Sequence, residues 1–561
     1  MFETSYGPVS LDTFIGTQLA SQGGESPNDV TYDDYVVTSD GGTILDALPM
    51  EHPIAPVLER VAGDERPGDT ETVGEHVTDG VSSTVLLLSA LLEEAETLLE
   101  RGLHPTTVRD GYTRSLSVAL DSLDESRIPI DDDTNSQSLE LATARTAMTG
   151  NDVGGMRDQW ATFAADAART TGYPTPETFA VEGVSTGSVR DSTLLSGTVL
   201  TRDEVADERM PTAVEDATVL VLSGYKRKDA GDGRVGGLRD PELQQDATIQ
   251  LESPGDVNEY EAVYDERQEQ IVQTLRRLDV DVVVSRLGIN DRYLAALAEH
   301  GILGIRGVNQ LKLKRVARST GATVVRDPSD ITADDLGYAG RVEQQRGEKR
   351  GSGRRRFVVF DECRDPASMT VFLRGNWGEI ETEAARQLRK ATAAVATARG
   401  EHGRRAGVVP GGGAIDISVA QDVRTAAPEE DSRAQLAMEA FADAIERLPY
   451  RLAVNAGLDP ISTVTTLRSK SAEHGPETGL FLPDGELVDV TEHGVFDPLA
   501  TKRRSYVTAV EVAGAVLRID DAIDAVSTDE PGDEGDAIYD DHAEKHMDHL
   551  DEQGTEGTRW G

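Results

Sequence analysis

The sequence predicts a multidomain α+β protein in which an α/β module lies between two mostly helical ends. Its 561 residues are enough for roughly three or four domains of about 150 residues, each able to bury a core. Short apolar runs alternate with helical segments between residues 280 and 325, which is typical of an α/β module. Apolar residues also recur at helical spacing towards both ends of the chain.

The chain is strongly acidic, with a net charge of −46 from 101 Asp and Glu against 55 Lys and Arg. Such a surface repels nucleic acid and anionic membranes, so we expect neither as a partner. The charge resembles that of halophile proteins. The single cysteine, Cys363, excludes an internal disulfide framework and suits a reducing compartment. We find no signal peptide and no apolar run long enough to span a bilayer, so the expected location is the cytoplasm.

Three consecutive glycines follow a short apolar run. Gly411, Gly412 and Gly413 can take positive φ without strain and let the backbone pass close to another group. The apolar segment that follows is compatible with a helix, whose first N–H groups would face this loop and favour an anion such as phosphate. A tight strand-to-helix turn would explain the same glycines without a ligand.

A second candidate anion site precedes an apolar helix. Asp79 and Gly80 lead to Ser82 and Ser83, and leucines then keep helical spacing until Gly102 ends the helix. The carboxylate offers an oxygen ligand for Mg²⁺, and the hydroxyl groups can donate to phosphate oxygens. An ordinary helix N-cap would use the same residue types.

The first 60 residues contain two polar stretches with glycine. The first includes Gly7 and Pro8. The second, residues 36–45, has the pattern of a β-hairpin around an Asp40-Gly41 turn.

The middle of the chain predicts a succession of short strands and helices. Helices are expected at residues 139–148, 159–168, 258–278, 291–299, 311–319 and 380–398. Strands are expected at residues 194–200, 217–222, 280–284, 302–305, 323–325, 357–360 and 370–374. Residues 341–356 are basic and rich in glycine. Because the whole chain is acidic, we expect a solvated loop there rather than a nucleic-acid site.

Helical spacing returns after the three glycines. One helix, kinked at Pro449, is expected to bury a face of five apolar residues: Leu436, Ala440, Ala444, Leu448 and Leu452. A last apolar helix is expected at residues 506–519. Beyond about residue 527 the chain is rich in Asp, Glu and Gly and should be disordered. The spacing of three histidines there could bind a metal, but a solvated segment is the preferred interpretation: His542, His546 and His549.

Several stretches, taken in order, resemble the group II chaperonins, the thermosome family. The strongest are VVPGGGA at 408–414, AFADA at 440–444, NAGLDP at 455–460 and LRIDD at 517–521. Further matches lie at residues 51–53, 104–106, 320–322 and 335–338. The resemblance extends over residues 6–525.

The resemblance implies a three-domain subunit of a folding chamber that uses ATP and Mg²⁺ and binds unfolded proteins. The equatorial domain is mostly helical and binds nucleotide, the two-piece intermediate domain is a hinge, and the apical α/β domain carries a helical protrusion. The implied ranges are equatorial 1–128 and 401–526, intermediate 129–187 and 366–400, and apical 188–365, followed by a disordered acidic tail at 527–561.

The resemblance also assigns site residues. Asp40 would position the attacking water, and Asp79 would hold Mg²⁺. Positions matching the nucleotide loops are Gly7, Pro8, Gly41, Gly80, Ser82, Ser83, Gly411, Gly412, Gly413, Gly494 and Asp497, of which the last two match the ribose pocket.

This sequence departs from the family pattern in the same site. Lys390 aligns with the catalytic Asp of the intermediate domain, and a cationic lysine cannot act as a base. Val9 and Ser10 replace the lysine of the first phosphate loop. Asn151 replaces a nucleotide-sensing lysine, and the hydroxyl loop lacks one threonine. The chain also begins almost at the first phosphate loop, so we expect the family's N-terminal helix and strand to be missing or not included.

These departures favour a chaperonin-like subunit that binds nucleotide, hydrolyses it poorly and works with other subunits in a homo- or hetero-oligomeric ring. Two alternatives stay open. One is a fully active, ATP-driven folding-chamber subunit. The other is a stand-alone protein that binds a partner and has a vestigial nucleotide site.

Overall fold

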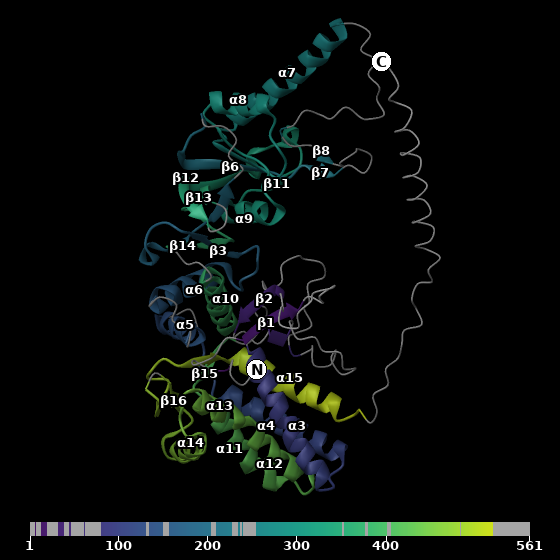
Figure 1. The fold of residues 1–561 in the computed structure, drawn as a ribbon, viewed down its shortest axis with the longest axis vertical. Coiled ribbons are helices and arrows are strands. Elements are labelled where there is room, and N and C mark those ends of the chain that lie inside the picture. The colour runs from purple at the N-terminus through teal and green to yellow at the C-terminus, as the bar shows by residue number, and fades with distance from the viewer. Residues whose placement is uncertain are drawn as a thin grey trace, which may run out of the picture.

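The computed structural model describes Tyr6 and residues 13–18, 32–38, 44–45, 61, 80–130, 134–149, 156–202, 209–226, 234–235, 238, 254–349, 353–375, 380–400, 406–482 and 484–519. They form an elongated molecule whose elements lie in three tiers along its long axis (Figure 1). Helices make up most of one end, helices with a small sheet form the middle, and a seven-stranded sheet with helices forms the other end.

The helical end joins segments from both parts of the chain around one apolar core. Its main helices are α3 (Val81–Glu100), α4 (Pro105–Glu125), α11 (Ala414–Ala426), α12 (Ala434–Ile445) and α15 (Leu499–Val516). Leu87 and Leu91 of α3 are fully buried here, as their helical spacing predicts. The crossing of α4 and α12 is close, because a Cβ on Gly111 would lie 2.5 Å from the Cβ of Ala437.

The single kinked helix expected over residues 436–452 is wrong. α12 ends at Ile445, and a second helix, α13 (Arg447–Asn455), begins after Glu446. Pro449 lies in the first turn of α13, where its missing N–H costs little. Leu436 was expected in the buried face but is 45% exposed, because it lies in the first turn of α12, where its neighbour Ala437 faces the core.

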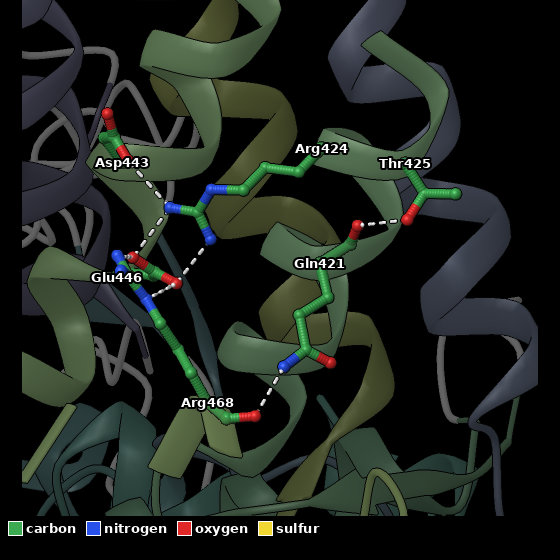
Figure 2. A network of polar contacts seen from close by, with 6 residues as sticks. All are labelled: Gln421, Arg424, Thr425, Asp443, Glu446 and Arg468. Carbon is green, nitrogen blue, oxygen red and sulfur yellow. Dashed lines mark hydrogen bonds and ion pairs between the residues drawn. The ribbon is translucent and has the colours of Figure 1, made fainter. Parts of the chain in front are cut away.

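The junction between α12 and α13 contains a buried carboxylate (Figure 2). Glu446 is 4% exposed and accepts hydrogen bonds from two guanidinium groups. Arg424 of α11 donates to its two oxygens at 2.6 and 2.8 Å, and the Nε of Arg468 donates at 2.7 Å. Arg424 also donates to Asp443 at 2.7 Å. Because Arg468 belongs to α14 (Pro460–His474), one carboxylate connects α11 and α14 to this junction.

The middle tier packs three helices around a second core. They are α5 (Thr134–Ala147), α6 (Arg157–Thr171) and α10 (Ile380–Ala398). Glu140 of α5 is 1% exposed. It accepts a hydrogen bond from Arg169 of α6 at 2.9 Å and forms an ion pair with Arg399, which directly follows α10. This carboxylate therefore joins all three helices.

A small sheet in the middle tier has the strand order β3-β14-β4. Its strands are β3 (Phe179–Val184), β14 (Met369–Arg374) and β4 (Thr193–Leu195). The strand expected at 194–200 is divided, because β4 ends at Leu195 and β5 (Thr198–Arg202) joins a different sheet. The chain passes very close to a neighbouring strand between them: a Cβ on Gly197 would lie 2.1 Å from the carbonyl oxygen of Phe360.

The seven-stranded sheet has the order β10-β9-β6-β12-β13-β5, with β11 paired to β6. Besides β5, its strands are β6 (Ala213–Leu222), β9 (Val282–Ser285), β10 (Leu303–Ile305), β11 (Val324–Val325), β12 (Gly337–Lys349) and β13 (Gly353–Asp361). β9 and β11 run parallel to β6, and β10 runs parallel to β9. The helices are α7 (Pro254–Arg277), α8 (Asp291–Glu299) and α9 (Gln310–Thr320). α7 projects from this end of the molecule (Figure 1). A small strand pair, β7 (Tyr225–Lys226) and β8 (Arg234–Val235), lies beside the sheet.

The basic segment 341–356 is not a solvated loop. It forms the end of β12 and the start of β13, which pair antiparallel with Arg346 opposite Arg356. Val342 and Val358 of the same strands are buried in the core of the sheet. The arginines hide the strand pattern in the sequence, but the apolar residues around them bury enough surface to build the strands.

The hairpin expected at residues 36–45 is also wrong. β2 (Tyr32–Thr38) pairs instead with β1 (Thr13–Gln18). Ile44 and Leu45, expected in a second strand, are helical and buried. Pairing with the preceding strand, β1, therefore replaces the pairing across the Asp-Gly turn that the sequence predicted.

Four short strands, in two pairs, precede the last helix. β15 (Val408–Pro410) pairs with β18 (Phe496–Pro498), and β16 (Thr478–Phe481) pairs with β17 (Glu486–Asp489). α15 begins at Leu499, earlier than expected. The acidic tail and its histidines lie outside the described residues. Of the helices that the structure describes, none combines the length and apolar character needed to cross a bilayer.

We expect Glu446→Gln to destabilise the helical end by about 1–3 kcal/mol, because two guanidinium groups would lose the charge that they share. Burial and the positive charge of Arg424 already lower the pKa of Arg468. Thermal unfolding in one high-salt buffer measures the effect. The matched control is Glu439→Gln, an exposed position on the same helix, which should leave the Tm unchanged. Equal losses in the two variants would contradict the prediction.

Candidate functional site

The sequence-predicted site residues fall into two groups. Outside the described residues lie Gly7, Pro8, Asp40, Gly41 and Asp79. Within them lie Gly80, Ser82, Ser83, Lys390, Gly411, Gly412, Gly413, Gly494 and Asp497.

The triple glycine joins β15 to α11 in a tightly packed turn. Gly412 and Gly413 have φ of +58° and +78°. A Cβ on Gly412 would lie 2.5 Å from the carbonyl oxygen of Leu480, and one on Gly413 would lie 2.7 Å from the Cβ of Pro449. Close packing and positive φ therefore require these two glycines even without a ligand. The strand-to-helix turn is present, and the glycines alone do not indicate phosphate.

The glycine turn lies beside the predicted ribose segment. Val409 of β15 pairs with Asp497 of β18, and the N–H of Gly411 donates to the carbonyl of Val495 at 3.0 Å. Gly494 has φ +69° and ends the loop before this strand. Residues 411–413 and 494–497 are thus adjacent in the fold.

The loop before β18 also contacts the middle tier. Thr146 of α5 accepts a hydrogen bond from the N–H of Phe496 at 3.2 Å and donates to the carbonyl of Gly494 at 3.4 Å. One threonine hydroxyl therefore connects a helix of the middle tier to the segment that carries Asp497.

The start of α3 lies next to the start of α15. Gly80 is the N-cap of α3 in the left-handed conformation, with no side-chain cap, and no acidic residue occupies the first turn. A Cβ on Gly80 would lie 2.8 Å from the Cγ2 of Thr501. The hydroxyls of Ser83 and Thr84 donate to the carbonyl of Gly80 at 2.9 and 2.8 Å. The N-terminus of α3 carries the partial positive charge of the helix dipole, and no carboxylate in its first turn neutralises that charge. This helix end is therefore suited to bind an anion.

Sequence reasoning missed three buried polar side chains, those of Asp416, Lys502 and Tyr506, that join these segments. Lys502 of α15 is 6% exposed, and its Nζ lies 3.1 and 2.9 Å from the two carboxylate oxygens of Asp416, which is fully buried. Tyr506 donates to Oδ1 of Asp416 at 2.6 Å. The Nζ of Lys502 also lies 3.3 Å from Oδ2 of Asp497. We call Asp416, Asp497, Lys502 and Tyr506 the buried charge cluster.

A weak pattern in the sequence points to part of this cluster. Asp416 stands between isoleucines in the first turn of an apolar helix, where a charge needs a partner if it is buried. Lys502 and Tyr506 are four residues apart and so share one face of α15. The sequence does not indicate that these two helices meet.

The buried charge cluster brings three distant segments together at the start of α15. Thr501 contacts Gly80, and the next residue, Lys502, binds both Asp416 and Asp497. Asp416 lies in the first turn after the triple glycine. The early and late segments therefore meet at one place.

The flanks of the two earliest loops lie at the same end of the molecule. Tyr6 directly precedes Gly7, and its carbonyl accepts a hydrogen bond from the Asn455 side chain at 2.5 Å. Burial raises the pKa of the Tyr6 hydroxyl, and the positive charge of Lys502 acts in the opposite direction and lowers it. Leu45, which follows Asp40 and Gly41 in the sequence, packs into the helical core.

The protonation of the cluster follows from its charges. Burial by itself would lower the pKa of Lys502, but the negative charges of Asp416 and Asp497 outweigh burial and hold this pKa well above its ordinary value. Burial and the charge of Asp416 raise the pKa of Tyr506 well above its ordinary value. At neutral pH the lysine is therefore cationic and the tyrosine is protonated, and both donate to Asp416.

Lys390, the residue expected to replace a catalytic carboxylate, is half buried on α10. It forms no hydrogen bond or ion pair with the residues that the structure describes. α10 contacts β18 and α15, which carry Asp497 and Lys502. The helix that presents this lysine is thus in contact with the elements of the buried charge cluster.

The donors at this site fit a phosphate group. The start of α3 combines an uncapped helix N-terminus with two serines, Ser82 and Ser83. Asp79, expected to hold Mg²⁺, comes directly before it and is outside the described residues. Among the residues that are described, no three His, Cys, Asp or Glu side chains gather as a metal site would require.

A separate cleft of about 420 Å³ lies between α7 and α8, in the tier of the large sheet. Its lining mixes charged, polar and apolar side chains: Gln268, Glu269, Val272, Gln273, Arg276, Ala296 and His300.

Known proteins resemble this chain over almost its whole length. The sequence profile of the TCP-1/cpn60 chaperonin family matches residues 1–527. Thermosome subunit 1 of Haloferax volcanii is 34% identical over 526 residues, which cover 93% of this chain and 86% of the relative. A thermosome subunit of Methanopyrus kandleri is 32% identical over 529 residues, covering 93% and 89%. Among solved structures, the open-state monomer of a group II chaperonin from Methanococcoides burtonii is 28% identical with a TM-score of 0.56, covering 79% of this chain and 100% of the other.

We expect Lys502→Met to cost about 3–5 kcal/mol at pH 8, because it leaves Asp416 buried without a cation. Since the pKa of Lys502 is raised, the lysine stays cationic at both pH 8 and pH 5, so its own contribution to stability does not change over this range. In the variant, an unpaired buried carboxyl group gains a proton as the pH falls, which relieves the penalty.

The difference in stability between wild type and Lys502→Met should therefore shrink from pH 8 to pH 5, as measured by thermal unfolding without nucleotide. The control is the double variant Lys502→Met/Asp416→Asn, for which the difference should not vary with pH. A constant difference for the single variant would contradict the prediction.

Proposed function

The chain belongs to the TCP-1/cpn60 chaperonin family as a group II member, and we propose that it is a chaperonin subunit that assists protein folding, binds ATP and hydrolyses it poorly. Thermosome subunits from several archaea are similar to the chain over most of its length, which supports the chaperonin part of this proposal. The proposal that ATP is hydrolysed poorly rests on the half-buried Lys390.

In this proposal the three tiers are the equatorial, intermediate and apical domains of a chaperonin subunit. We assign residues 1–128 and 401–526 to the equatorial domain, 129–187 and 366–400 to the intermediate domain, and 188–365 to the apical domain. One core that joins both parts of the chain supports the first assignment. The seven-stranded sheet with its separate core supports the last.

The proposed nucleotide site uses the segments that converge at the start of α15. The N–H groups at the N-terminus of α3, next to Gly80, would donate to phosphate oxygens, as would the hydroxyl of Ser82 and, on exchanging its bond to the Gly80 carbonyl, that of Ser83. Residues 411–413 and Gly494 would line the nucleotide, and the carboxylate of Asp497 would accept hydrogen bonds from the ribose. Asp79 would hold the Mg²⁺ that neutralises phosphate charge, and Asp40 would orient water.

Lys390 explains why hydrolysis would be poor. Its position aligns with a catalytic Asp of the family, and a lysine that is cationic cannot take a proton from water. Half burial and the lack of a partner among the described residues leave its charge available for a phosphate. The lysine would stabilise bound ATP while removing the base.

The proposed partners are unfolded or partly folded proteins and other chaperonin subunits, in a homo- or hetero-oligomeric ring. The cleft between α7 and α8 has the mixed character expected of a surface for unfolded clients. A fully active subunit would need another residue to act as the base. A stand-alone binding protein would keep the cleft and not assemble.

We expect Lys390→Asp to raise the ATPase rate by roughly 10²–10⁴-fold, because it restores a carboxylate where general-base catalysis is expected. The measurement is phosphate release in molar salt with Mg²⁺ and ATP. Lys390→Ala is the matched control, because it removes the cation without adding a base, and its rate should stay low.

A different pattern would contradict the impaired site. Suppose that the wild type hydrolyses ATP, that Lys390→Ala leaves this rate unchanged, and that Asp40→Ala abolishes it. Hydrolysis would then not depend on position 390, and the fully active alternative would be correct.

We expect light scattering in molar salt to give a mass many times that of one 60.3 kDa chain. High salt is required because a net charge of −46 repels other copies when it is not screened. If the chain stays at the mass of a monomer, the protein does not assemble with itself. Adding a second chaperonin subunit from the same cell then distinguishes a mixed ring from a stand-alone protein.

A further inference from the structure

One member of the buried charge cluster, Asp497, is partly exposed to solvent. The side chain of Asp416 is fully buried and that of Lys502 is 8% exposed, whereas the side chain of Asp497 is 29% exposed. Tyr506 is also fully buried. Lys502 therefore contacts one carboxylate in the interior and one that solvent can reach.

We propose that Lys502 is a positioning residue that orients the carboxylate of Asp497 towards the ribose hydroxyls of a bound nucleotide, with Asp416 and Tyr506 holding Lys502 in place. This inference rests on the proposed nucleotide site, in which Asp497 faces the ribose.

The contacts of Lys502 account for all its donors. An ammonium group has three N–H donors, and its Nζ lies within 3.3 Å of three carboxylate oxygens, two on Asp416 and one on Asp497. The side chain is too deeply buried to reach a ligand directly. Its effect on a ligand must therefore pass through Asp497.

The anchor that holds the lysine is rigid. Asp416 accepts two contacts from Lys502 and one from Tyr506 at 2.6 Å. Both partners lie on α15, one helical turn apart, whereas Asp416 lies on α11, so the orientation of the lysine depends on the packing of two helices. Buried ion pairs of this kind are screened little by salt.

The carboxylate that Lys502 holds is placed to act on the ligand. Asp497 lies on β18 opposite Val409, directly before the glycine turn. A nearby cation favours the ionised form of a carboxylate, which accepts hydrogen bonds and suits hydroxyl donors such as those of ribose. Loss of the cation would remove the ion pair through which Lys502 orients the carboxylate of Asp497.

Nucleotide binding by variants of the buried charge cluster distinguishes a role in stability alone from a role in positioning Asp497. If the cluster only stabilises the fold, its variants should unfold at lower temperature without changing which nucleotide is preferred. If Lys502 positions Asp497, its variants should lose the contribution of the ribose hydroxyls alone. The ratio of the Kd values for 2′,3′-dideoxy-ATP and ATP reports that contribution.

The experiment measures Kd for ATP, 2′,3′-dideoxy-ATP and ADP in molar salt, at a temperature at which circular dichroism shows each variant to be folded. We expect wild type to prefer ATP over the dideoxy analogue by about 10-fold or more. Lys502→Met should reduce this preference to near equality while the ratio of ADP to ATP affinity stays unchanged. Asp497→Asn should have the same effect, and the double variant should show no further loss.

Two variants with smaller changes test the same inference if Lys502→Met does not fold. Tyr506→Phe removes one donor to Asp416 and should lower the ribose preference in part, and Lys502→Arg should retain part of it because it keeps the charge. The matched control is Glu446→Gln, which perturbs a buried carboxylate of the same helical end and should leave the preference intact.

The outcomes separate this inference from the proposed function. If wild type binds no ATP, the proposed nucleotide site is wrong and the inference falls with it. If wild type binds ATP without ribose preference, the nucleotide site stands and the role of Asp497 and Lys502 is overturned. If wild type shows the preference and both Lys502→Met and Tyr506→Phe keep it in full, only the role of Lys502 is overturned.

Discussion

The ion pair between Lys502 and Asp416 is the interaction on which the arrangement of the site depends. It joins the first turn of α15 to the first turn of α11, and these two helices follow the strand of Asp497 and the triple glycine. The neighbouring Thr501 contacts Gly80 at the start of α3. Segments separated by more than 300 residues therefore take their positions from one point in the interior, because a buried charge has to find its partner.

Buried carboxylates that accept from several donors recur in the helical and middle tiers. Glu446 is shared by Arg424 and Arg468, Glu140 is shared by Arg169 and Arg399, and Asp416 is shared by Lys502 and Tyr506. In each case one buried carboxylate receives donors from at least one other helix. The chain has almost twice as many acidic as basic residues, so most carboxylates must face solvent. The few that are buried have several donors each, which offsets the cost of removing them from water.

Membership of the chaperonin family and the altered chemistry of the site are compatible. The family match covers nearly the whole chain, and three distant segments converge at the start of α15. The proposed loss of catalysis concerns Lys390, on a helix of the middle tier that touches β18 and α15. A fold depends on many contacts, whereas catalysis depends on a few groups, so one substitution can change the second and leave the first.

The sequence by itself determined the fold class, the order of most helices and strands, and the family. Periodicity identified α8 and α10 to the residue, because the spacing of their apolar positions is a local feature. The tertiary structure decided the pairing of β2 with β1, the strands in the basic segment 341–356 and the break at Glu446. The basic segment forms a hairpin whose strands also pair with the distant β6 and β5, whereas β2 pairs with the strand just before it and the break at Glu446 lies three residues before Pro449. The contacts of Asp416 in the buried charge cluster were also decided by the tertiary structure, since Lys502 and Tyr506 lie 86 and 90 residues away in the sequence and only the packing of α11 against the start of α15 brings them to it.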